Sequence, residues 1–468
     1  MSTAAASTEP PPGESPEQRP LAGPLEGTAL RMSILRFALP ASVEVVLHQL
    51  FGLVDQIFVA SLGEASFVAV GLTTQVVSLA FVLLAALGSG AAIQLARYAG
   101  AGDAEAFSAA AARMLQVAVG VAVVVSVGVA LGARPAMQAL GAAPEVVDKG
   151  VFFTRLVAWS LPFMALMELG NQVLRARGDA RSPMVIGLAA LAMNSVLNYA
   201  LIFGWWGLPR MGLAGAGVAT LLARVLGFGL VCGLLFSRRH VLRVRWKDMG
   251  RLESGRLRAL LVLALPVAAG QGVWLLGMMG YTRVYAELGT RELAAANVIN
   301  QLEAVCILLS FGFGMACLTL VGQELGRKDP AQARRVAAEC LRLALGVSVV
   351  TGALLAGAAL VLEPLYPGLE AGTRALAMTG LLVSALMQPV KARNMVMALG
   401  VLRGGGDVRF TMVCEAFMLV GIVCAWALGV PLGWGLVGVL VGRACEELLK
   451  LAAFSWRYAS GRWVHEVR

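Results

Sequence analysis

Residues 39–63 read LPASVEVVLHQLFGLVDQIFVASLG, an apolar stretch that carries Glu44, His48 and Asp55. A stretch of this length crosses the roughly 30 Å hydrocarbon core of a membrane as one helix. At 100° per residue the three polar side chains lie at about 0°, 40° and 20°, so they share one helix face. Because an ionised carboxylate at mid-membrane costs about 2.5 to 3.5 kcal/mol, this face is expected to point into protein or a watery cavity. A structural ion pair within the bundle is the alternative for each residue.

The composition of the chain extends this reading to the whole molecule. Of 468 residues, 58% are hydrophobic and 14% are charged, and the mean hydropathy is +0.77, which excludes a soluble protein. Apolar runs such as 114–131 lack the alternation of membrane β-strands. We therefore predict an all-α polytopic membrane protein with twelve transmembrane helices, at 34–60, 66–96, 110–132, 150–173, 183–204, 212–236, 259–286, 292–322, 337–362, 374–399, 410–430 and 434–455.

Basic residues gather in every second connection. The connection between the sixth and seventh segments is the most basic, with Arg238, Arg239, Arg243, Arg245, Lys247, Arg251, Arg256 and Arg258. Since such loops stay in the cytoplasm, both termini of this multi-pass protein are predicted to be cytoplasmic. The same rule explains the net charge of +10 without nucleic acid. With no signal peptide recognised, a bacterial inner membrane is the expected location.

The two halves of the chain repeat one another. Pro40 matches Pro266 at an offset of 226 residues, and LRARGDARSPM at 174–184 matches LRGGGDVRFTM at 402–412. This indicates a duplicated six-helix unit, so that two parallel, pseudo-symmetric bundles enclose a cleft, as alternating access requires. The expected division is a disordered cytoplasmic tail at 1–32, an N-terminal lobe at 33–236, a basic cytoplasmic linker at 237–258, a C-terminal lobe at 259–455 and a cytoplasmic tail at 456–468.

Further polar residues interrupt the apolar segments at helical spacings of three and four. Hydrogen bonding between helices explains them without any ligand, and this alternative stays open. We expect Arg443, Glu446 and Glu447 to pair locally. The candidates for a substrate cavity are Gln75, Asn171, Trp274, Tyr281, Asn300, Gln301, Glu303, Gln388, Lys391 and Asn394.

Several classes of function lack their signatures. No GxxxxGK[ST] phosphate loop and no catalytic triad occur, and GGGD at 404–407 fits a tight turn. The seven cysteines and three histidines are scattered, so no metal site or cofactor is expected and the protein is predicted not to be an enzyme. Energy for transport would then come from an ion gradient.

The stretch 39–63, GAGD at 100–103, the twin LRxxGD motifs and NMVMALG at 394–400 together resemble the multidrug and toxic compound extrusion (MATE) family of prokaryotic type. The resemblance covers about residues 33–460 and implies two six-helix lobes that export mostly cationic or aromatic compounds against protons or sodium. It also implies an ion-coupling acid at Asp55, completed by Asn194, Asn198 and Thr220. Asn198 stands where many members have Asp, so one formal charge is missing, and Glu44 and His48 are candidates to tune or extend the site.

We therefore predict a secondary active exporter, an antiporter working by alternating access as a monomer among membrane lipids. Its coupling ion is H⁺ or Na⁺, and its substrate a small cationic or aromatic compound. Because Lys391 and Arg393 would repel cations, an anionic or zwitterionic metabolite is an alternative. A flippase for a lipid-linked precursor is another, since it prefers a large cationic cavity to which Arg224 could contribute. A membrane enzyme or scaffold would explain the helices but not the duplication.

Overall fold

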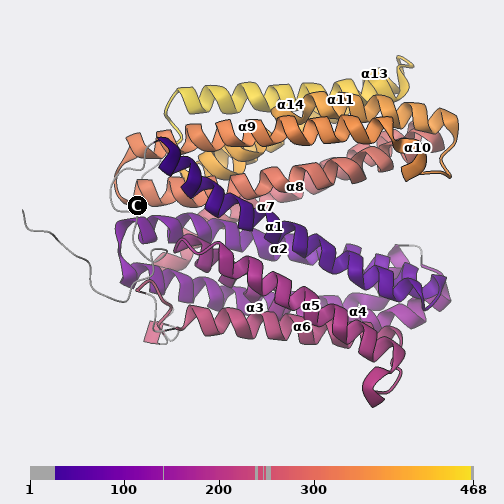
Figure 1. The fold of residues 1–468 in the computed structure, drawn as a ribbon, viewed down its shortest axis with the longest axis horizontal. Helices are drawn as coiled ribbons and strands as arrows, with labels where there is room; N and C mark the ends of the chain where they lie inside the picture. The colour runs from indigo at the N-terminus through magenta and orange to yellow at the C-terminus, as the bar shows by residue number, and fades with distance from the viewer. Residues whose placement is uncertain (1–26, 141, 238–240, 246, 249–253, 465–468) are drawn as a thin grey trace, which may run out of the picture.

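The fold is seen in a computed structural model that describes residues 27–140, 142–237, 241–245, 247–248 and 254–464. Within these ranges the chain is almost entirely helical and contains no strand (Figure 1). Eleven segments are long and apolar enough to cross a membrane. The twelfth predicted span is α14 (Gly435–Ala459), whose 25 residues extend over about 37 Å at 1.5 Å per residue. The prediction of an all-α protein with twelve transmembrane helices is confirmed.

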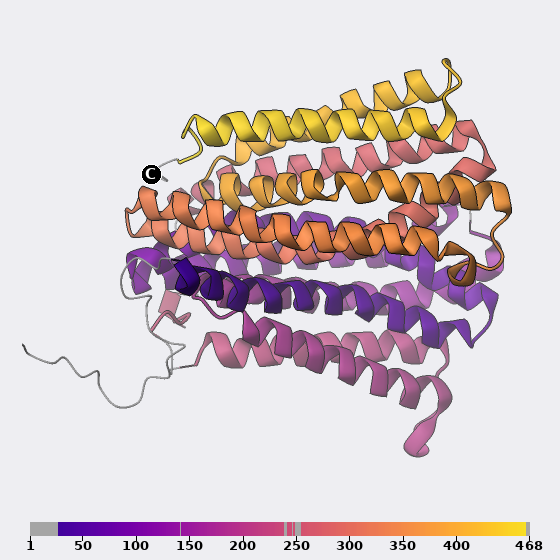
Figure 2. The ribbon, with the colours of Figure 1, turned by 45° about the horizontal axis from the view of Figure 1, so that its top comes forward.

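The helices form two groups, one from each half of the chain, which differ in colour in Figures 1 and 2. The first lobe contains α1 (Gly27–Ala60), α2 (Glu64–Ala101), α3 (Ala104–Ala139), α4 (Pro144–Ala176), α5 (Arg181–Phe203), the short η1 (Trp205–Gly207) and α6 (Leu213–Leu235). The second contains α7 (Ser254–Leu288), α8 (Thr290–Gly326), α9 (Pro330–Leu360), α10 (Leu362–Leu365), α11 (Ala371–Met395), the π-helix η3 (Val396–Leu402), α12 (Val408–Glu415), α13 (Phe417–Gly429) and α14.

Three element ends differ from the predicted division. Helix α1 begins at Gly27, so residues 27–32 are helical and not part of a tail, because Leu30 packs on the second lobe and Arg31 forms a salt bridge with Glu339. Helix α7 begins at Ser254 and α14 ends at Ala459, inside the regions predicted as linker and tail. Residues 1–26, 465–468 and parts of the basic linker lie outside the described residues.

The repeat in sequence is a repeat in local structure. Asp103 and Asp329 cap α3 and α9, each accepting a hydrogen bond of 2.9 Å from a backbone N–H three residues on. In the LRxxGD turns, Gly178 and Gly406 adopt φ values of 96° and 88°. Since L side chains rarely adopt such angles, these glycines are required for the turn, which is the role predicted for the GGGD segment.

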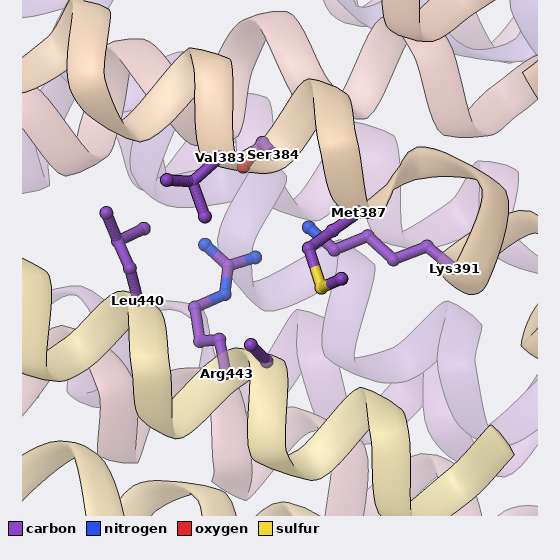
Figure 3. A pocket seen from close by; sticks show the side chains of 7 residues that line it. Val383, Ser384, Met387, Lys391, Leu440 and Arg443 are labelled. Atoms are coloured by element: carbon purple, nitrogen blue, oxygen red, sulfur yellow. The ribbon is translucent and has the colours of Figure 1, made fainter. Parts of the chain in front are cut away.

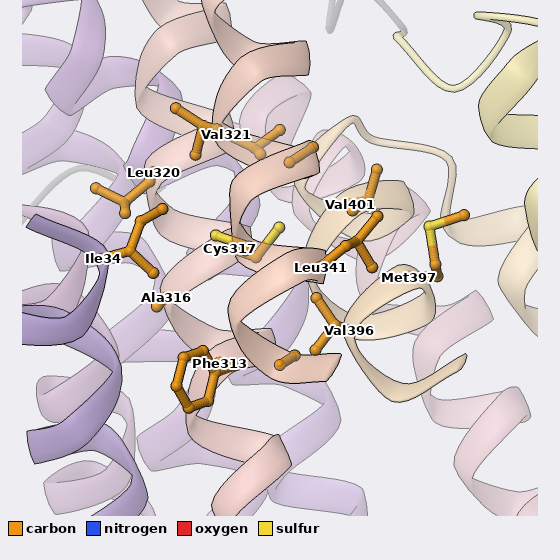
Figure 4. Packing of buried hydrophobic residues seen from close by; sticks show 14 of the residues in the cluster. Ile34, Phe313, Ala316, Cys317, Leu320, Val321, Leu341, Val396, Met397 and Val401 are labelled. Atoms are coloured by element: carbon orange, nitrogen blue, oxygen red, sulfur yellow. The ribbon is translucent and has the colours of Figure 1, made fainter. Parts of the chain in front are cut away.

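The two lobes are joined at the end of the molecule where α1 begins. Ile34 of α1 packs with Phe313 and Cys317 of α8 in a cluster that also includes residues of α9 and η3 (Figure 4). At this end Arg31 forms a salt bridge of 2.5 Å with Glu339. Three hydrogen bonds to backbone carbonyls also cross the interface: Arg97 to Gly405 (2.7 Å), Gln323 to Ala176 (2.9 Å) and Ser42 to Leu309 (3.0 Å).

Helices α2 and α8 cross closely at one pair of glycines. A methyl group on Gly100 would overlap the backbone of Gln323, and one on Gly326 would overlap the backbone of Arg97. The two glycines occupy equivalent positions of the repeat. The close crossing therefore depends on the absence of a side chain on both helices.

We expect Gly100→Ala to lower the melting temperature of the purified protein in detergent. Overpacking costs about 1–3 kcal/mol, which exceeds the gain of about 1 kcal/mol in helix propensity. Gly128→Ala on α3 is the matched control, because nothing lies within 4 Å of its added methyl group. Equal melting temperatures for the two variants would show that the crossing tolerates a side chain.

Candidate functional site

Asp55 lies in the second half of α1 and points into the first lobe. Asn198 of α5 donates from Nδ2 to Oδ1 of Asp55 (2.7 Å) and to Oδ1 of Asn194 (3.2 Å). The hydroxyl of Thr220 on α6 lies 3.1 Å from Oδ2 of Asp55 and 3.0 Å from the carbonyl of Ala216. All four side chains are buried. The structure thus brings together the four residues that the resemblance had grouped.

Glu44 is held in a separate, charged cluster. It forms a salt bridge with Arg175 of α4 and accepts a hydrogen bond of 3.0 Å from Asn171. Arg175 also binds Glu168 at 2.9 Å. The structural ion pair, considered as the alternative for Glu44, is therefore present. Arg175 is the arginine of the first LRxxGD motif, which suggested a loop position, so it was not predicted as a partner of Glu44. The signal that could have found it is the spacing of Glu168 and Arg175, seven residues apart on one helix face.

The remaining polar groups near Asp55 do not pair with it. His48 stacks on Phe81 of α2 with 5.2 Å between ring centroids. The guanidinium of Arg224 lies 4.0 Å from the centroid of the Phe51 ring, where it is attracted to Asp55 without forming a salt bridge among the described residues. Asp55 is therefore held by neutral hydrogen-bond donors, whereas Glu44 is neutralised by a cation.

The second lobe contains a cavity of about 210 Å³ between α7, α8, α11, α13 and α14. Five of the predicted cavity residues line it, namely Trp274, Tyr281, Asn300, Glu303 and Lys391. Glu303 forms a salt bridge with Lys391, and Arg443 lies 3.4 Å from the same carboxylate. Figure 3 shows Arg443 and Lys391 turned toward a smaller adjoining cavity that is also lined by Met387.

Other predicted cavity residues lie elsewhere. Gln301 accepts a hydrogen bond of 3.1 Å from Tyr366 in an exposed position, Gln75 is exposed on α2, and Gln388 is fully buried. Asn171 binds Glu44 in the first lobe, and Asn394 binds Glu447 at 2.7 Å. None of these five residues is part of the lining of the 210 Å³ cavity.

The charged residues of α14 depart from the prediction. Arg443 donates to Asn300 of α8 at 3.1 Å, and Glu447 accepts from Asn394 of α11. The expectation of local pairing is therefore wrong for these two, because their side chains reach neighbouring helices across the cavity. Glu446 does bind Lys450 one turn later (2.8 Å), and it also accepts from the hydroxyl of Tyr281 (2.6 Å).

Comparison with known proteins agrees with this arrangement. The MatE family model matches twice, at residues 40–200 and 266–427, once in each lobe. The chain belongs to the MatE family. As a MatE protein it is a membrane transporter of small molecules and not an enzyme.

Relatives of this MatE protein extend over nearly its whole length. It is 22% identical to the uncharacterized transporter YisQ of Bacillus subtilis, over 93% of this chain and 95% of that protein. It is 25% identical to the probable multidrug resistance protein NorM of Thermotoga maritima, over 93% of each chain. The crystal structure of the Vibrio cholerae MATE transporter VcmN in the bent form has the same fold, with a TM-score of 0.84 and 20% identity over 93% of this chain and 97% of that one.

We expect Arg175→Met to destabilise the MatE protein strongly, because it leaves Glu44 and Glu168 without their cation inside the lobe. Removing one partner of a buried ion pair costs about 3–5 kcal/mol. Arg134→Met is the control, since the salt bridge between Arg134 and Asp148 is exposed and worth about 0–1 kcal/mol. Melting temperatures in detergent compare the two. A drop no larger for Arg175→Met than for the control would contradict the structural role of this cluster.

Proposed function

We propose that this MatE protein is a secondary active exporter that antiports small organic compounds against protons or sodium. The observation that carries the proposal is the environment of Asp55. Its carboxylate is buried and accepts hydrogen bonds from neutral donors, Asn198 and Thr220, and it forms no salt bridge in the described part of the chain. An ionised group in such a place is costly, so it gains from binding a proton or a small cation.

Ion binding at Asp55 would change the partners of α1. A proton or sodium ion neutralises the carboxylate and weakens its hydrogen bonds from Asn198 of α5 and Thr220 of α6. Since hydrogen bonds to a charged acceptor contribute about 1.5–3 kcal/mol each, their loss shifts the balance between two arrangements of these helices. An inward ion gradient would then bias the cycle toward export of the substrate.

The proposed orientation rests on the connections at the end where the lobes are joined. The end where α1 begins and the lobes are joined is called the closed end. It contains the turns at 101–103, 177–180, 326–329 and 403–407, which include connections predicted to be cytoplasmic. With that assignment both termini are cytoplasmic and the structure is closed toward the cytoplasm. A bacterial inner membrane fits the bacterial relatives. Exposed apolar side chains such as Leu131, Leu360 and Leu386 would contact lipid, and one chain supplies both lobes, so a monomer suffices.

The cavity supports a small substrate over a lipid-linked precursor. A flippase for such a precursor would favour a large cavity with excess cationic charge. The cavity in the second lobe measures about 210 Å³ and is lined by three acidic and three basic residues. Its aromatic side chains, Trp274 and Tyr281, suit a compound with a ring.

We expect Asp55→Asn to abolish ion-coupled transport in proteoliposomes. The amide keeps the size of the side chain but no longer binds a proton or contributes a charge. The measurement is substrate movement driven by an imposed pH or sodium gradient, using an aromatic cation such as ethidium. Glu145→Gln, a matching carboxylate-to-amide change at an exposed salt bridge with Lys149, is expected to transport like the wild type. Gradient-driven transport by Asp55→Asn at the wild-type rate would exclude Asp55 as the coupling residue.

The proposed orientation is tested by cysteine labelling in intact cells. In a cysteine-free background, we expect Glu145→Cys to react with a membrane-impermeant maleimide from outside. We expect Lys328→Cys, on the opposite face, to react only after permeabilisation. The reverse pattern would place the closed end of the lobes outside the cell.

A further inference from the structure

The charged residues around the cavity of the second lobe form two separate groups. Glu303 is bound by two cations, Lys391 and Arg443, which leaves this group with a net charge of +1. Lys450 is bound by two carboxylates, at 2.8 Å from Glu446 and 3.1 Å from Glu415. Glu447 adds a further carboxylate to the wall beside Glu446. The cavity therefore has a positive side, formed by Lys391 of α11 and Arg443 of α14, and a negative side on the next turns of α14.

An aromatic wall connects these two sides. Tyr281 donates from its hydroxyl to Glu446 of the negative group (2.6 Å). The guanidinium carbon of Arg443, in the positive group, lies 5.9 Å from the centroid of the Tyr281 ring. Trp274 lies about two helical turns before Tyr281 on α7, and 43% of its surface is exposed. A flat ring placed along this wall would hold its substituents near both charged groups.

We infer that this cavity is a binding site for amphoteric aromatic compounds, with a carboxylate against Lys391 and Arg443 and an ammonium group against Glu446 and Glu447. The six charged residues of the lining balance, so a compound with one charge is favoured on one side only. A compound with both charges is favoured on both. This inference rests on the proposed export function and narrows its substrate class.

The volume limits the size of the ligand. At about 210 Å³ the cavity is smaller than the roughly 300–1,000 Å³ that drug-sized ligands occupy. One fused ring system with an amino acid group matches this space. The inferred class is therefore that of small aromatic amino acids and similar zwitterions.

Three probes with one indole ring test the charge preference. L-tryptophan is a zwitterion, tryptamine a cation and indole-3-propionate an anion. Binding is measured by isothermal titration calorimetry on the full chain in lipid nanodiscs, without any ion gradient. We expect L-tryptophan to bind at least about tenfold more tightly than the other two, a difference of roughly 1.4 kcal/mol. Equal affinities, tighter binding of tryptamine, or no binding of any probe would overturn the inference.

Two variants test which side binds which group. Glu447→Gln is expected to weaken the binding of L-tryptophan and tryptamine about tenfold while leaving the affinity for indole-3-propionate unchanged. Arg443→Gln is expected to weaken the binding of L-tryptophan and indole-3-propionate while leaving the affinity for tryptamine unchanged. A merely structural cluster would affect the three probes alike, and this result would also overturn the inference. The comparison of probes on the wild-type protein remains decisive if a variant does not fold.

The result is separable from the proposed coupling mechanism. The affinity for L-tryptophan is measured on the wild-type protein without an ion gradient, so the preference among the probes does not require Asp55 to couple transport. Failure of the coupled transport assay with tryptophan binding intact would therefore count against the role of Asp55 alone. Coupled transport of ethidium without the tryptophan preference would count against the amphoteric site alone.

Discussion

The structure depends on one contrast between carboxylates buried in the membrane-spanning helices. Glu44 and Glu303 each contact a basic side chain, Arg175 and Lys391, so their charges are compensated inside the protein. Asp55 accepts hydrogen bonds from the neutral side chains of Asn198 and Thr220 and forms no salt bridge among the described residues. A compensated pair stabilises a lobe in one arrangement. A buried carboxylate without a salt-bridge partner gains from an ion that binds and leaves. This difference separates the residues that stabilise the fold from the residue that responds to a gradient.

Helix α1 connects that carboxylate to the arrangement of the lobes. Its first half packs on the second lobe, through Ile34 and the hydrogen bond from Ser42 to Leu309. Its second half belongs to the first lobe, where Asp55 contacts α5 and α6. A change in the bonds of Asp55 therefore acts on a helix that both lobes share. The close crossing of α2 and α8 at Gly100 is a second direct contact between the lobes, beside that of α1.

Much of the fold and of the site around Asp55 could be predicted from the sequence. The same physical principles explain which contacts could not be predicted. The shared face of Glu44, His48 and Asp55 follows from helix geometry, and the family resemblance grouped Asp55 with Asn198. Periodicity gives the face of a side chain on its own helix but not the neighbouring helix that it meets. Asn300 and Gln301 are adjacent in sequence, yet one lines the cavity and the other bonds Tyr366 outside it. Arg443 was misjudged for the same reason, since its partners Asn300 and Glu303 come from α8.

The most direct test of the account is whether the charge on Asp55 sets the arrangement of the lobes. Spin labels are placed at the exposed positions Glu105 and Ala331, on α3 and α9 at the closed end. Pulsed electron–electron double resonance measures the distance between the two labels. The account predicts that acidification or added sodium shifts the distance distribution in the wild-type background. It predicts no such shift in the Asp55→Asn background. An equal shift in both would contradict the claim that this carboxylate couples the ion to the lobes.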